Sequence, residues 1–148
     1  MNAYKTMKDA QQDEVNAFPL AFAFDQKQFD EGMRKLGLDP SETDKIYGLP
    51  HTGGFYRRTD APALHEMLER HEKQRNDAIK SDPTGDGFIF DMFNYELANH
   101  EYVLTGSLDD TFGALGLSLD EVSVNPAMRH GLRRAREAQW KETWPDAE

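Results

Sequence analysis

Two carboxylates, a histidine and two tyrosines crowd into the ten residues FNYELANHEY, at Phe93–Tyr102. In a helix, Glu96 and His100 are four residues apart on one face, where a carboxylate and an imidazole can share a proton or a metal ion. Zinc usually takes three or four protein ligands, and the chain has no cysteine and no H-E-x-x-H motif. A ligand- or metal-binding enzyme centred on Glu96, His100 and Glu101 is therefore kept as an alternative hypothesis, whereas the leading interpretation expects no metal and no cofactor.

A structural network explains the same residues more simply. Helix ends leave backbone carbonyl groups unpaired, and Asn99 and His100 lie where this helix should end. A buried Glu96 needs a cationic or hydrogen-bonding partner. Arg75 lies within the apolar stripe of the preceding predicted helix. We therefore predict that Arg75 pairs with Glu96 or Glu101 between the two helices.

The helix that carries Glu96 must be buried on most sides, because its apolar residues cover more than half of its circumference. Asp25, Ser107 and Ser118 are expected to cap three other helices, and Ser107 and Ser118 have the capping-box spacing to Asp110 and Glu121. The helices are expected at about 3–17, 26–36, 61–80, 88–100 and 126–140, the paired strands at 20–24 and 53–58, and a loop at 38–52.

These elements predict an α+β fold that is mostly α-helical with a small two-stranded β-sheet. Residues 1–19 are predicted to form an N-terminal helix, mobile or docked on a partner, because its apolar face is thin. Residues 20–144 are predicted to form a single globular domain. No apolar run approaches the roughly 20 residues that cross a bilayer, and the N-terminus lacks an apolar signal segment. A cytoplasmic protein with no membrane contact is expected.

The net charge of −10 is concentrated in one stretch of the chain. Residues 81–128 contain nine Asp and Glu residues and no Lys or Arg. Such a surface repels phosphates, so no direct binding to nucleic acid is expected, whereas a basic protein surface would be attracted. The predicted partner-binding residues are those on short, exposed pieces: Asp109, Asp110, Asp120 and Glu121. The alternatives are a solvated acidic surface that keeps the protein soluble, and an oligomerising module that uses exposed Phe and Trp.

The pattern GF-x3-MF-x-YEL-x-NHEY-x2-TG occupies residues 87–106, with GGF before it and GLRRA after it. With these motifs the chain resembles, from about Leu20 to Ala135, a family of small uncharacterised proteins from bacteriophages and mobile elements. It departs from that pattern at Phe112, where the family commonly has leucine.

The resemblance implies a context rather than an established activity. Small acidic proteins of phage type are often non-enzymatic binders that block a host machine. It implies an inhibitor or regulator in the host bacterial cytoplasm, such as an anti-CRISPR protein that acts as a DNA mimic. Its partner would be a host protein with a basic nucleic-acid-binding surface, such as a CRISPR effector, since an acidic face can occupy a groove built for phosphates.

Overall fold

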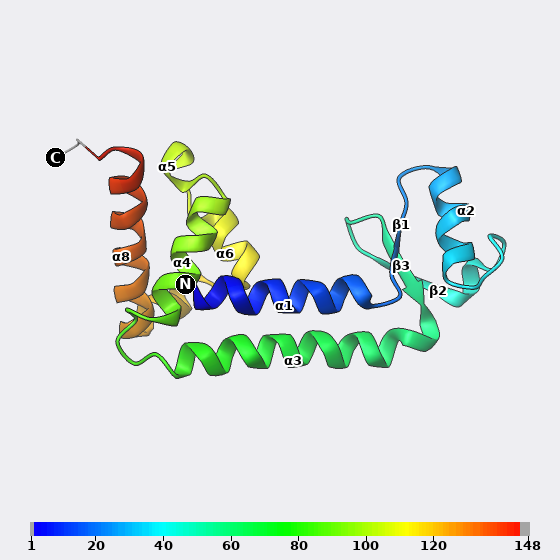
Figure 1. The fold of residues 1–148 in the computed structure, drawn as a ribbon, viewed down its shortest axis with the longest axis horizontal. Coiled ribbons are helices and arrows are strands. Elements are labelled where there is room, and N and C mark those ends of the chain that lie inside the picture. The colour runs from blue at the N-terminus through cyan, green and yellow to red at the C-terminus, as the bar shows by residue number, and fades with distance from the viewer. Residues whose placement is uncertain (1, 146–148) are drawn as a thin grey trace. The chain divides into compact units, whose positions relative to one another are not determined.

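A computed structural model describes residues 2–145 of the chain (Figure 1). These residues divide into two compact units. The helical unit comprises residues 2–9 and 74–145, and the sheet unit comprises residues 10–73. Helices α1 (Ala3–Ala17) and α3 (Ala61–Lys80) contribute residues to both units. The architecture is the expected mostly helical α+β fold.

The sheet unit contains three antiparallel strands in the order β1-β3-β2, one strand more than expected. Strands β1 (Ala21–Phe22) and β3 (Gly54–Arg57) pair as predicted, with Ala21 opposite Phe55. The additional strand, β2 (Ile46–Leu49), lies within the segment expected to be a loop. The sequence does not predict this strand, because its four residues lack the alternation of apolar and polar side chains that marks a half-buried strand. They include Gly48, and none of them is fully buried. Two 3-10 turns, Thr43–Lys45 and Arg58–Asp60, precede β2 and follow β3.

Helix α2 (Gln26–Lys35) begins at the predicted cap, because the Asp25 carboxylate accepts a hydrogen bond from the Gln28 backbone N–H at 2.7 Å. It packs against the sheet through a buried cluster that includes Met33, Leu36 and Phe55. A second cluster of the sheet unit comprises Leu20, Tyr56, Leu64 and Met67.

Residues 10–17 of α1 and 61–73 of α3 are joined by ion pairs within the sheet unit. Glu14 contacts the Arg70 guanidinium at 2.7 Å and the His71 imidazole at 3.1 Å. Hydrogen bonds from Arg70, and then from His71, lower the pKa of Glu14. The second half of α1 is thus docked by charge as well as by the apolar side chains of Val15 and of Phe18, which follows the helix.

The helical unit is built around α4 (Phe88–Asn99), as its apolar circumference predicted. Ile89, Met92, Phe93 and Leu97 of this helix are all completely buried. Helix α8 (Pro126–Thr143) packs along α4 (Figure 1). The remaining helices of this unit are short: α5 (Tyr102–Thr105), α6 (Asp109–Leu115) and α7 (Leu119–Val124).

One of the two predicted serine caps is present. Ser118 accepts a hydrogen bond from the Glu121 backbone N–H at 3.1 Å and starts α7. The prediction for Ser107 and Asp110 is wrong, because α6 begins after Leu108 and the Ser107 hydroxyl accepts from the backbone N–H of Asp109 instead.

Gly131 lets α8 approach α4 closely. A Cβ atom at this position would lie 2.5 Å from a methyl group of Ile89 and 2.8 Å from the carbonyl oxygen of Gly85. The backbone on one side and a buried side chain on the other leave little room to adjust.

We predict that Gly131→Ala lowers the free energy of unfolding by about 1–3 kcal/mol, because the methyl group overpacks this contact. Gly113→Ala in α6 is the matched control, since a Cβ there meets nothing within 4 Å. It should stabilise the protein by about 0.5–1 kcal/mol through helix propensity. Urea denaturation of both variants measures the contrast, and equal effects would contradict the close packing at Gly131.

Candidate functional site

The carboxylate of Glu96 is completely buried within the helical unit. The Lys8 ammonium lies 2.6 Å from its Oε1 atom, and the Tyr4 hydroxyl donates a hydrogen bond to the same atom at 3.2 Å. Both partners come from the first turns of α1. The ammonium of Lys8 also lies 5.1 Å from the centre of the Tyr95 ring, a cation–π distance. Glu96 therefore binds the start of α1 to α4.

His100 completes this cluster on the other side of the carboxylate. Its Nε2 atom lies 3.3 Å from Oε2 of Glu96, as the spacing of four residues predicted. Burial, followed by the negative charge of Glu96, raises the pKa of Tyr4 well above its ordinary range. Tyr4 therefore keeps its proton at neutral pH and donates a hydrogen bond to Glu96.

Lys8, rather than Arg75, supplies the charge that compensates Glu96. Within residues 2–145, Arg75 forms no ion pair with Glu96 or Glu101. Its guanidinium lies near Gly116, and its positive charge acts to lower the pKa of Tyr4. The sequence does contain a signal for Lys8, because Tyr4 and Lys8 are four residues apart and share a helix face.

Glu96, His100 and Glu101 do not converge on one site. Glu101 adopts a left-handed backbone conformation with φ of 53°, and its side chain is exposed, whereas Glu96 is inaccessible. Asn99 is also exposed, and the backbone N–H groups of His100 and Glu101, rather than the predicted side chains, bond the carbonyls of Glu96 and Ala98. In the described part of the chain, no three His, Asp or Glu side chains are placed to hold a metal ion.

Asp82 replaces the side-chain cap that Gly87 cannot provide for α4. Its carboxylate accepts hydrogen bonds from the backbone N–H groups of Gly85, Gly87 and Ile89, at 3.0, 3.1 and 3.0 Å. Burial alone would raise the pKa of Asp82, but these bonds and one from Thr84 outweigh burial and lower it.

Two more acids of the stretch 81–128 have structural partners. Asp86 lies 2.8 Å from Nε2 of His130 and 2.6 Å from the Arg134 guanidinium. Asp91 accepts a hydrogen bond from the backbone N–H of Ala3 at 3.1 Å. With Asp82 and Glu96, four of the nine acids are used by the fold itself.

The five other acids are exposed and, among residues 2–145, have no cationic partner: Glu101, Asp109, Asp110, Asp120 and Glu121. The last four are the predicted partner-binding residues, and they lie in the first turns of α6 and α7. Leu119 and Val124 on α7 are 61% and 81% exposed. We call residues 101–124 the acidic segment. It combines unpaired carboxylates with exposed apolar side chains.

Lys8→Met should lower the free energy of unfolding by about 1–3 kcal/mol, because it leaves a buried carboxylate without its cation. The value is below that of a fully buried pair because the Lys8 side chain is 38% exposed. Lys5→Met is the matched control, since Lys5 pairs with Asp9 on the exposed surface of the same helix and such pairs contribute little. Equal effects in urea denaturation would contradict the role of Glu96.

Asp82 makes stability depend on pH in acid. Its lowered pKa in the folded state means that its contribution is fully present above the ordinary value of 3.8 and is lost as the pH falls through the folded value. Asp82→Asn should therefore be less stable than the wild type at neutral pH, and the difference should shrink below about pH 4. Thermal denaturation across this range measures it, and a difference that grows in acid would refute the assignment.

Comparisons with known proteins give a family but no function. No helix in residues 2–145 is both long and apolar enough to span a membrane. No curated protein and no solved structure matches the chain. A family model described as a family of unknown function, DUF7659, matches residues 3–138. This match extends beyond the segment 20–135 that carried the sequence resemblance, and the chain belongs to the DUF7659 family.

Proposed function

We propose that this protein is a non-enzymatic inhibitor or regulator that binds a partner protein through its acidic segment, residues 101–124. The observation that carries the proposal is the division of the nine acids. Four have partners within the fold, and five are exposed and have no cationic partner among residues 2–145, on a stretch that contains no Lys or Arg. Unpaired like charges on one short segment repel one another, and a basic partner relieves that repulsion.

The exposed apolar residues make a contact more specific than charge alone. Leu119 and Val124 adjoin Asp120 and Glu121 on α7. Charges at the rim of an interface steer the encounter and set its rate, while apolar side chains that become buried slow dissociation. A partner with basic residues around an apolar surface fits this combination.

The burial of Glu96 favours a binding function over an enzymatic one. Its carboxylate is occupied by Lys8 and Tyr4 and is closed to solvent. A docking role for α1 accounts for this residue without a substrate. The enzyme hypothesis would need Glu96 and Glu101 to act together, although one is buried and the other is exposed.

The sequence resemblance to phage and mobile-element proteins suggests the kind of partner. A host defence protein, such as a CRISPR effector, holds nucleic acid in a basic groove, and its Lys and Arg residues bind phosphates. An acidic protein that enters such a groove competes with nucleic acid. We propose this host protein as the partner and the host bacterial cytoplasm as the place of action.

Reversal of two charges tests the proposal. A tagged protein should capture a nucleic-acid-binding protein from nuclease-treated bacterial lysate at low salt and release it at high salt. Asp109→Lys with Asp110→Lys should lower the association rate by roughly tenfold or more at low salt. Glu31→Lys with Glu69→Lys is the control, because it changes net charge equally at exposed positions outside the acidic segment. Capture that is independent of salt, or equally weakened by both pairs, would refute the proposal.

A further inference from the structure

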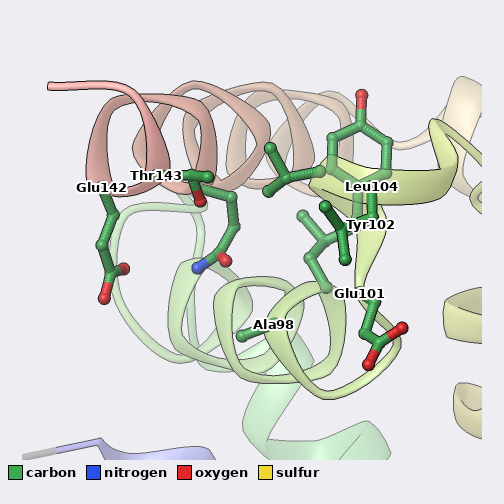
Figure 2. Close-up of a pocket in the computed structure, with 9 residues that line it drawn as sticks. Ala98, Glu101, Tyr102, Leu104, Glu142 and Thr143 are labelled. Atoms are coloured by element: carbon green, nitrogen blue, oxygen red, sulfur yellow. The ribbon is translucent and has the colours of Figure 1, made fainter. Parts of the chain in front are cut away.

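A groove of about 420 Å³ lies between the end of α4, α5 and the end of α8 within the helical unit. Its lining includes Ala98 and Tyr102 on one side and Gln139 and Thr143 on the other. This volume is within the range of sites that hold one small ligand or one anchoring side chain. Figure 2 shows these side chains around the groove.

The floor of the groove is fixed by buried contacts. Leu97 of α4 is completely buried beneath it. The amide nitrogen of Gln139 donates hydrogen bonds to the side-chain oxygen and the backbone carbonyl of Asn94, at 2.7 and 3.3 Å. These bonds hold α8 against α4, so the groove is formed before any partner arrives.

The outer wall consists of apolar surface that is open to solvent. Leu104 on α5 is 74% exposed although it lines the groove. The ring of Tyr102 stands beside it, and Figure 2 shows that its hydroxyl group points away from Glu101. That hydroxyl accepts a hydrogen bond from Arg136 at 2.8 Å, and the guanidinium lies 5.5 Å from the ring centre. Arg136 is therefore already engaged by Tyr102.

The charged members of the lining are both acidic. Glu101 and Glu142 line the groove, and in the described chain neither forms an ion pair. Figure 2 shows the two carboxylates at opposite ends of the groove, with Ala98 between them. The groove thus offers apolar walls for a side-chain stem and a carboxylate at each end for a cationic head group.

We propose that this groove receives an arginine side chain of the partner protein. The three methylene groups would lie against Leu104 and Tyr102, and the planar guanidinium would pair with Glu101, which Figure 2 shows on the same side of the groove as Tyr102. Glu142, at the other end of the groove, adds to the negative potential that attracts the cation. The inference rests on the proposed function, since it specifies how a basic partner is anchored. It adds a second contact to the steering by Asp109 and Asp110.

The probe is a short peptide of alternating arginine and leucine, blocked at both ends, titrated into the ¹⁵N-labelled full chain. Amide shifts should change around the groove, at Ala98, Val103 and Thr143. A peptide with citrulline in place of arginine keeps the shape but loses the charge, and it should bind about tenfold more weakly or worse.

Glu101→Gln with Glu142→Gln should weaken binding of the arginine peptide by a similar factor of about ten. Glu137→Gln with Glu31→Gln is the matched control, because both residues are exposed and lie outside the groove lining. An otherwise unchanged amide spectrum shows that each variant is folded.

The outcomes separate this inference from the proposed function. Shifts confined to α6 and α7, with affinity lost only in Asp109→Asn with Asp110→Asn, would overturn the groove and support the acidic segment. No binding of the arginine peptide, or equal binding of the citrulline peptide, would also overturn the groove. Capture of a partner from lysate tests the proposed function independently of either result.

Discussion

The helical unit depends on one buried carboxylate. Glu96 lies in the last turn of α4, among buried side chains that are mostly apolar, and a charge there is tolerated only if it is paired. Lys8 and Tyr4 provide the pairing, and both belong to the first turns of α1. The same charge that would destabilise an isolated core therefore fixes the N-terminal residues to α4. Asp91, one turn earlier on α4, adds a hydrogen bond to the start of α1.

The acidic stretch separates into two sets that the net charge alone cannot distinguish. Asp82, Asp86, Asp91 and Glu96 are bound by backbone N–H groups or cations, so their charge is neutralised within the fold. The carboxylates of the acidic segment have no such cation in the part of the chain that the structure describes. Four of them lie in the first turns of α6 and α7 and stabilise these short helices: Asp109, Asp110, Asp120 and Glu121. This position also places their charge at the surface, where a basic partner would meet it first.

Structural features that depend on residues close together in the sequence could be predicted from the sequence. The Asp25 cap, the Ser118 cap and the apolar circumference of α4 each involve residues within a few turns of one another. The missed features depend on distant partners or on weak local patterns. Lys8 and Glu96 are 88 residues apart, and Arg75, within the apolar stripe of the preceding helix, met the same requirement. Asp82 caps α4 although it lies five residues before Gly87, which occupies the usual capping position. Strand β2 has no alternation of apolar and polar residues that marks it as a strand.

The central claim is that four of the nine acids stabilise the fold, whereas the other five are exposed and available to a partner. Measuring the stability of single substitutions at these acids tests it most directly. Each acid is changed singly to its amide, and the free energy of unfolding is measured in urea at neutral pH. The account predicts the largest losses at the buried carboxylates Asp82 and Glu96. It predicts changes within about 1 kcal/mol at Glu101, Asp109, Asp110 and Asp120, since a surface carboxylate at a helix N-terminus contributes no more. Losses at Asp109 and Asp110 as large as that at Glu96 would show that these acids support the fold, and would contradict the account.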